Sequence, residues 1–380
     1  MKRFKVFFLY SNWKWTGPAE PALSFAESLS QKGVEVHFFS ASPPKGDPPI
    51  LRKKVEEASA KSGIIPRTEL SLSKHIRYGK NWKDSRKLAQ LVREERPHLI
   101  HTHLTNDHLI AALAKTGLPI VRSFFESQWP YLRTKFLLSR STSHIFTIGS
   151  IYQEELTKKF GFPSEKITLL HTGVHHSRFS PERELPPMRE RFGFSKEDIV
   201  VGMVARIQPH RRFEIFLQAF QNLAPQFPHL KALIVGRGTH IQEVAIDPVK
   251  KAGLSSRFVF SGFLEGDEYV GALKAMDILV FMVPGRDGSC RAVREAMAMG
   301  LPVLAGNQGI LPELVNKANG GNIFEYRSES LENEMRKWIL DKELRVRAGR
   351  KNREFALKNF SYSKESEKIL EVYKECINHG

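Results

Sequence analysis

Two carboxylates, Asp287 and Glu295, stand eight residues apart with a short loop of small residues, 288–290, between them. The run 292–299 is typical of a helix, and Gly300 is the residue type that ends one. A loop that enters a helix presents unpaired backbone N–H groups at the positive end of the helix dipole, which suits phosphate. Carboxylates accept hydrogen bonds from hydroxyl groups. The pattern predicts a site for a phosphate or a polyhydroxyl ligand, and the simpler alternative is an ordinary acidic helix start.

A cluster of arginines follows the apolar run 199–204, which is typical of a buried strand. Arg206 comes two residues after this run, and Arg211 and Arg212 come shortly after Arg206. In parallel sheets the carboxyl ends of the strands border the crevice in which ligands bind. The guanidinium fork matches the oxygens of a phosphate group. We therefore expect Arg206 and Arg211 to hold a phosphate, against the alternative of a solvated basic cluster.

A further strand, expected at 231–235, ends in Gly236 and Gly238. Glycines at such a place let a nucleotide approach the backbone closely. The chain contains no Gly-x-Gly-x-x-Gly sequence, which argues against the dinucleotide-dependent redox enzymes.

Short apolar runs alternate with longer helical patterns along the chain, which predicts an α/β protein with parallel sheets flanked by helices. Three prolines between 181 and 187 lie among charged residues and indicate a linker. We expect one domain over 1–185, a second over 196–360 and a terminal helix over 361–380. The expected strands are 5–10, 34–40, 98–101, 119–122, 144–148 and 167–170 in the first domain, and 199–204, 231–235, 258–261, 278–282 and 302–305 in the second.

The formal net charge of +17 is concentrated in the first half of the chain. Residues 1–190 carry 30 Lys and Arg against 18 Asp and Glu, a net charge of +12, whereas residues 191–380 carry 28 against 23, a net charge of +5. Such a surface attracts a membrane leaflet, a phosphorylated glycolipid or nucleic acid, although many soluble proteins are simply basic. Two cysteines make no disulfide framework and fit a reducing cytosol. Without a signal peptide or a run of about 18 apolar residues, we expect a soluble or peripheral protein.

The segment 285–315 resembles the signature of the family 4 glycosyltransferases, in which Glu follows an acidic residue eight positions later. These are retaining enzymes with the GT-B fold, in which two Rossmann-like domains face a central cleft. The family usually has Glu where this chain has Asp287, which is one methylene shorter. The resemblance rests on Asp287 and Glu295 together with Gly300-Leu301-Pro302-Val303, Gly309 and Glu313 at the family spacing.

The resemblance implies roles for the donor side. Arg206 matches a family arginine and Arg211 stands where the family has lysine, both on the donor diphosphate, while Asp287 and Glu295 hold the sugar or the ribose. The nucleotide sugar is a substrate, so no cofactor is expected. The Asp-x-Asp pair of metal-dependent transferases is absent, so no metal is expected either. The implied donor-binding residues are Gly17, Gly236, Phe263 beside the base, Gly288, Ser289, Cys290, and Glu313 on the ribose.

The first domain would then bind the acceptor. His103 ends a histidine-rich strand, where the family commonly has His, and we interpret it either as an acceptor contact or as packing. The family usually carries another His, near the reacting sugar, at the position that Phe125 occupies here. We expect Arg122 or Glu126 to take over its role, or the donor to differ at the hydroxyl that His would contact.

These patterns favour a retaining, metal-independent glycosyltransferase that moves a sugar from a nucleotide-sugar donor to an anionic glycolipid or saccharide acceptor, in the synthesis of cell-envelope polysaccharide or lipopolysaccharide. We expect a cytoplasmic protein that associates with the inner face of the plasma membrane and binds no nucleic acid. Two alternatives stay open. One is a nucleotide-sugar epimerase or hydrolase on the same fold, which turns over donor without an acceptor, and the other is a non-catalytic polyanion-binding protein.

Overall fold

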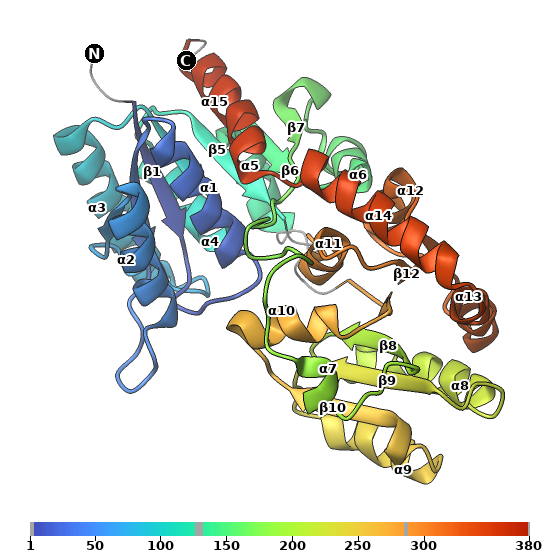
Figure 1. The fold of residues 1–380 in the computed structure, drawn as a ribbon. Helices are drawn as coiled ribbons and strands as arrows, with labels where there is room; N and C mark the ends of the chain where they lie inside the picture. The colour runs from blue at the N-terminus through green and yellow to red at the C-terminus, as the bar shows by residue number, and fades with distance from the viewer. Residues whose placement is uncertain (1–3, 126–131, 285–287, 379–380) are drawn as a thin grey trace. The chain divides into compact units, whose positions relative to one another are not determined.

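The computed structural model describes residues 4–125, 132–284 and 288–378, drawn as a ribbon in Figure 1. The chain forms two compact units, each built on one parallel sheet with helices between its strands, which confirms the expected α/β class. The first unit comprises Met1–Gly173, Arg286–Ser289 and Tyr362–Gly380, and the second comprises Val174–Gly285 and Cys290–Ser361.

The first unit contains a seven-stranded parallel sheet in the order β3-β2-β1-β4-β5-β6-β7. In β1 every residue from Val6 to Tyr10 is buried, as expected for a parallel strand with helices on both faces of the sheet. The strand order reverses between β1 and β4, so the carboxyl ends of these two strands border the switch point of this unit. The strands are β1 (Lys5–Tyr10), β2 (Glu35–Ser40), β3 (Ile65–Arg67), β4 (Leu99–Thr102), β5 (Ile120–Phe124), β6 (His144–Thr147) and β7 (Ile167–Leu169).

The helices of the first unit include one from the far end of the chain, because α15 packs against α1 (Figure 1). The Tyr373 hydroxyl of α15 lies 2.5 Å from Nδ1 of His101 in β4, and Glu365 accepts a hydrogen bond from the N–H of His171 at 2.8 Å. These buried polar contacts fix the last helix on the first sheet. The helices are α1 (Ala19–Gln31), α2 (Ile50–Ser62), α3 (Tyr78–Glu95), α4 (Thr105–Ala114), α5 (Leu132–Ser141), α6 (Ser150–Phe160) and α15 (Tyr362–Asn378).

The second unit contains a six-stranded parallel sheet in the order β10-β9-β8-β11-β12-β13. In chain order within the unit this is 3-2-1-4-5-6, the arrangement of the Rossmann fold, with its switch point between β8 and β11. A ligand of such a sheet binds beyond the carboxyl ends of the strands at that point. The strands are β8 (Ile199–Val204), β9 (Leu230–Val235), β10 (Phe258–Gly262), β11 (Ile278–Phe281), β12 (Val303–Gly306) and β13 (Gly321–Phe324).

Helices connect the strands of the second sheet, and one connection, after β9, begins as a π-helical turn, η3 (Gln242–Ile246). Across both units, no helix within the described parts of the chain is long and apolar enough to cross a membrane. The helices of the second unit are α7 (Met188–Arg191), α8 (Phe213–Leu223), α9 (Asp247–Lys251), α10 (Gly266–Lys274), α11 (Arg291–Ala298), α12 (Leu311–Ala318), α13 (Ser328–Leu340) and α14 (Lys342–Asn359).

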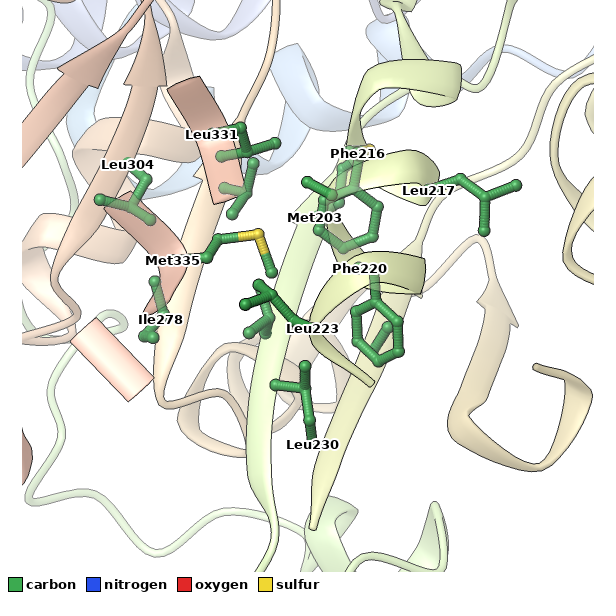
Figure 2. Packing of buried hydrophobic residues seen from close by; sticks show 14 of the residues in the cluster. Met203, Phe216, Leu217, Phe220, Leu223, Leu230, Ile278, Leu304, Leu331 and Met335 are labelled. Atoms are coloured by element: carbon green, nitrogen blue, oxygen red, sulfur yellow. The ribbon is translucent and has the colours of Figure 1, made fainter. Parts of the chain in front are cut away.

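Aromatic side chains of α8 form the centre of the second core (Figure 2). Phe216 and Phe220 stand four residues apart on one helix face, and both are fully buried. The ring of Phe220 lies 4.6 Å from the ring of Phe258 in β10, centroid to centroid. Leu331 and Met335 of α13 belong to the same cluster. Burial of this apolar face is what holds α8 and α13 to the sheet.

Two short edge strands were not expected from the sequence. β3 contains Pro66, which has no backbone N–H to donate to a neighbouring strand, so the sequence favours a loop there. An edge strand tolerates a proline. β13 begins at Gly321, and a Cβ there would lie 1.8 Å from the carbonyl oxygen of Val303 in β12. Gly321 is not typical of a strand, so β13 was not expected from the sequence. The same glycine lets β13 pair closely with β12.

Truncation of Phe220 tests the second core. We expect Phe220→Ala to lower the free energy of unfolding of the second unit by about 3–5 kcal/mol, because a fully buried ring leaves a cavity. Urea denaturation followed by circular dichroism measures this loss. The control is Leu340→Ala, whose side chain is 69% exposed and whose truncation should cost under about 0.5 kcal/mol. Equal losses in the two variants would contradict the assignment of the core.

Candidate functional site

The carboxyl ends of the strands of the second unit lie along one edge of its sheet, because all of them are parallel. Each donor-side residue expected in this unit comes after one of these ends. This places the candidates from separate parts of the sequence at one edge. Arg206 and Arg211 follow β8, Gly236 follows β9, Phe263 follows β10, Cys290 and Glu295 follow β11, and Glu313 follows β12.

The two glycines after β9 allow the neighbouring loop to pack against their backbone. A Cβ at Gly236, where φ is +137°, would lie 2.0 Å from the carbonyl oxygen of Ala205, and one at Gly238 would lie 1.7 Å from that of Ile207. Side chains at these positions would therefore separate the two loops. Backbone N–H groups also donate across the same loops, from Ala205 to the carbonyl of Val235 at 3.1 Å and from Ile207 to that of Arg237 at 3.2 Å.

The two arginines after β8 differ in how firmly they are held. Arg206 is exposed, and its guanidinium has no ion-pair partner in the described part of the chain. Arg211 is half-buried, and its Nη1 donates to the carbonyl oxygen of Val283 at 2.5 Å. Because Val283 follows β11, this bond joins the loops on either side of the switch point. Arg212 adopts a left-handed conformation (φ 59°) immediately before α8.

Glu295 lies on α11 with its side chain buried, and two groups fix it. The hydroxyl of Tyr269 on α10 donates to Oε2 of Glu295 at 2.6 Å. Nε of Arg291, one helical turn earlier, lies 3.6 Å from Oε1. A buried carboxylate held in this way has its oxygens at defined positions from which it can accept further hydrogen bonds. Asp287, the other member of the acidic pair, lies outside the described residues.

The small residues before α11 are all buried. Gly288 and Ser289 group with the first unit, where the N–H of Gly288 donates to the carbonyl oxygen of Phe125 at 2.9 Å. This amide therefore already has an acceptor, which the sequence did not indicate. Cys290 precedes the helix in a left-handed conformation, φ 48°.

Two further donor-side candidates lie at the same edge of the second sheet. Glu313 is in the first turn of α12 and pairs with Lys317 at 2.7 Å. Phe263 is 59% exposed, and the guanidinium of Arg237 lies 4.9 Å from the centre of its ring. An exposed aromatic ring beside the carboxyl end of β10 offers a flat face to a nucleotide base.

The acceptor-side candidates lie in the first unit. Gly17, which is a donor-side candidate, is also in the first unit, in the turn between β1 and α1. His103 follows β4 and is 4% exposed, and its ring stacks on that of His101 at 4.5 Å between centroids. Burial, and then the charge of Arg122, lower the pKa of His103 to about 3, so the ring is neutral at physiological pH. Glu126 lies outside the described residues.

The Nε2 atom of His103 is buried and has no hydrogen-bond partner in the part of the chain that the structure describes. Buried polar atoms are nearly always paired. His103 is therefore both a packing residue, as its ring contacts show, and a residue with spare hydrogen-bonding capacity at the carboxyl end of β4. The ring contacts agree with the packing interpretation, and the acceptor contact of His103 stays a prediction.

A buried carboxylate beside His103, Asp107, was not recognised from the sequence. It accepts hydrogen bonds from the N–H groups of Ser11 (2.9 Å), His103 (3.2 Å) and Leu104 (2.9 Å). Burial raises its pKa to about 7, while these N–H groups and Arg122 act in the opposite direction. Asp107 is at the third position of α4, where an acidic side chain caps a helix, and this position was the available signal.

Within residues 4–125, 132–284 and 288–378, no group of three or more His, Cys, Asp and Glu is arranged to hold a metal ion.

The buried neutral His103 predicts a pH effect on stability. An unfolded histidine takes up a proton below about pH 6.5, whereas folded His103 does so only near its pKa of about 3, so its contribution to stability is lost as the pH falls below 6.5. Between pH 7 and 5, wild type should lose about 2 kcal/mol more than His103→Phe. Urea denaturation at both pH values measures the difference, in which the opposite effect of Asp107 cancels. Parallel pH profiles would contradict it.

Two family models match the chain and together take in most of it. The model described as "Glycosyl transferases group 1" matches residues 186–355. The model described as "Glycosyltransferase Family 4" matches residues 17–178. The model "Glycosyl transferases group 1" therefore matches the second unit almost exclusively. The model "Glycosyltransferase Family 4" matches the first unit, except for its last residues, which belong to the second unit.

Several relatives match over much of their length. N-acetyl-alpha-D-glucosaminyl L-malate synthase of Bacillus anthracis is 22% identical over 364 residues, which are 92% of this chain and 90% of that protein. UDP-Gal:alpha-D-GlcNAc-diphosphoundecaprenol alpha-1,3-galactosyltransferase of Escherichia coli is 24% identical over 326 residues, 81% of this chain and 83% of that protein. Spore coat protein SA of Bacillus subtilis is 25% identical over 252 residues, 62% of this chain and 66% of that protein.

Among solved structures, Anabaena Alr3699/HepE in complex with UDP matches with a TM-score of 0.81 at 19% sequence identity, over 98% of this chain and 100% of that one. At this identity the likeness concerns the fold, and it confirms the expected GT-B class. Because the two family matches cover both sheets and the elements that carry the candidate residues, the chain belongs to glycosyltransferase family 4 and is a glycosyltransferase.

Proposed function

We propose that the second unit binds a nucleotide-sugar donor, that the first unit binds the acceptor, and that the sugar is transferred with retention and without a metal ion. One observation carries the donor site. Arg206, Arg211 and the buried Glu295 all follow the two strands, β8 and β11, that flank the switch point of the second sheet. That point is where sheets of this order bind nucleotides.

The two arginines are suited to different parts of one task. Arg211 is anchored on the carbonyl of Val283, so the direction of its guanidinium is set before a ligand arrives. Arg206 is exposed and can close on the ligand. Two guanidinium groups on a diphosphate stabilise the negative charge that develops as the sugar leaves, which is the role a metal cation has elsewhere. The departing phosphate then serves as the base, so no enzymatic nucleophile is required.

The carboxylates are suited to hydroxyl groups of the donor. Glu295 keeps one oxygen on Tyr269 and the other near Arg291, so a hydroxyl meets a carboxylate whose position is already fixed. This supports a role on the sugar or the ribose. Glu313 in the first turn of α12 is proposed for the ribose, and Asp287 for the sugar. Phe263 is proposed to lie beside the base.

We propose an anionic glycolipid as the acceptor, in the synthesis of cell-envelope polysaccharide or lipopolysaccharide on the cytoplasmic face of the membrane. The net charge of +12 on residues 1–190 supports an anionic acceptor. The name of the Escherichia coli relative, which states a diphosphoundecaprenol-linked acceptor, supports a lipid-linked one. In the first unit, His103 and Arg122 are the described acceptor-side candidates, and Glu126 is the third. An acceptor screen in which only neutral, soluble sugars are glycosylated would overturn this part.

Thermal denaturation with UDP-, GDP-, ADP- and CMP-sugars tests the donor site. We expect one of them to raise the Tm by mass action and thereby to identify the base. Turnover of that donor should need an acceptor and should survive EDTA. Release of free or epimerised sugar without an acceptor would favour the epimerase or hydrolase alternative. Absence of a shift with every donor would contradict nucleotide-sugar binding.

The arginines give a sharper prediction. Arg206→Ala and Arg211→Ala should each lower kcat/KM by about 100-fold or more, since each removes a cation from the departing diphosphate. Arg206→Ala should change the free energy of unfolding by under about 0.5 kcal/mol because the side chain is exposed. Arg211→Ala should cost about 1 kcal/mol through the lost bond to Val283.

Lys250→Ala is the matched control, because Lys250 is an exposed cation on α9 of the same unit. It should leave both kcat/KM and stability unchanged. Activity losses that merely follow the loss of folded protein would mark Arg206 and Arg211 as structural residues.

A further inference from the structure

We infer that the amino-terminal part of α3 and the loop before it form a surface that docks on an anionic lipid bilayer. We call this surface, made by the exposed side chains of residues 74–86, the α3 patch. The inference rests on the proposed function, since it names the surface by which the first unit would reach a lipid-linked acceptor. It is drawn from the exposure, charge and rigidity of this segment.

Large apolar side chains are exposed here to an unusual degree. Tyr78 is 89% exposed, Trp82 58% and Ile76 37%. In the described parts of the chain, this is the one stretch of seven residues that exposes three large apolar side chains. Isolated exposed apolar residues are ordinary, whereas a group of them marks an interaction surface. Tyr and Trp are enriched at membrane–water interfaces, because their amphipathic rings contact the apolar layer and the polar headgroups at the same time.

The charge around these rings has one sign. Five Lys and Arg lie within residues 74–86, and Asp84 is the single acidic residue there. Asp84 is buried and accepts the N–H groups of Ser71 and Leu72, each at 2.9 Å, so its carboxylate is turned away from solvent. The exposed charge of the patch is therefore wholly positive. Anionic headgroups attract such a cluster, and the attraction grows with each cation.

The helix places rings and cations on the same face. Tyr78, Trp82 and Arg86 are spaced by four residues along α3 and form one stripe. The guanidinium of Arg86 lies 4.8 Å from the centre of the Trp82 ring. A cation stacked on an interfacial ring can reach lipid phosphates while the ring enters the headgroup layer.

Buried hydrogen bonds hold the loop before α3 in place, so the patch is not a loose segment. Nδ2 of Asn81 on α3 donates to Oδ1 of Asn106 at 2.5 Å, and Nδ2 of Asn106 donates to the carbonyl of Ser73 at 2.6 Å. Asn106 is in the first turn of α4, next to Asp107, which binds the N–H of His103. The patch is thus tied to the carboxyl end of β4, where the acceptor is proposed to bind.

A lipid surface fits these features better than a single-stranded nucleic acid. Nucleic-acid sites of that kind combine a basic groove with several rings on which successive bases stack. In the α3 patch one face of the Trp82 ring is already covered by Arg86. Exposed rings on a fixed helix, with cations around them, match the requirements of an interfacial helix instead.

Sedimentation of the full chain with vesicles tests the inference. We expect binding to equimolar phosphatidylcholine and phosphatidylglycerol and little to phosphatidylcholine alone. Lys80→Glu with Lys83→Glu, and separately Tyr78→Ser with Trp82→Ser, should each weaken binding by about tenfold or more. Lys250→Glu with Lys251→Glu, two exposed cations of α9 in the second unit, makes the same change in net charge and should leave binding near wild type.

Equal loss in the patch and control variants would overturn the inference, because only net charge would then matter. Binding of a single-stranded RNA that the patch variants lose, without binding to either vesicle, would overturn it in favour of a nucleic-acid surface. The donor-induced rise in Tm is measured on the same proteins and separates the two proposals. If the donor stabilises the protein and vesicles do not bind, the inference about the α3 patch is wrong and the proposed function stands. If vesicles bind and no donor stabilises the protein, the proposed function is wrong and the membrane-docking surface stands.

Discussion

Carbonyl oxygens of the loop after β8 occupy the space where side chains at Gly236 and Gly238 would begin. The rest of the candidate donor site depends on this contact. It brings the loops after β8 and β9 within hydrogen-bonding distance, so that the backbone is anchored on both sides of Arg206, at Ala205 and Ile207. Arg211 then ties the same loop to the one after β11. The loops that carry the arginines proposed to bind the diphosphate are thereby held by backbone geometry and need little rearrangement to meet a charged ligand.

The candidate site of the first unit differs from the donor site, because its polar side chains are buried. His101, His103, His108 and Asp107 are almost wholly removed from solvent, which costs stability unless each is neutral or hydrogen-bonded. His108 lies between the hydroxyls of Thr102 and Thr142, and Asp107 accepts backbone N–H groups. The network fixes the carboxyl end of β4 and couples it to α15 through His101. The buried hydrogen bonds hold these side chains in fixed positions, and the buried neutral histidines make the stability of the first unit sensitive to low pH.

Much of this architecture could be predicted from the sequence, and the exceptions have physical causes. β1 and β8 have the bounds expected from the sequence, 5–10 and 199–204, whereas β3 and β13 contain the proline or glycine that an edge strand tolerates. Spacing along the chain could place Arg206 and Glu295 after strand ends. It could not show that Tyr269 holds Glu295, or that Ser11 donates to Asp107, because those pairs are 26 and 96 residues apart in sequence.

Hydrogen–deuterium exchange with and without the nucleoside diphosphate of the stabilising donor tests the central claim most directly. The account predicts slower exchange in the second unit at 205–212, 236–238 and the starts of α11 and α12, because these segments follow the carboxyl ends of the sheet that would hold the diphosphate. The helices on the far edge of that sheet should be unchanged. Slowed exchange confined to the first unit, or none at 205–212, would contradict the placement of the donor site.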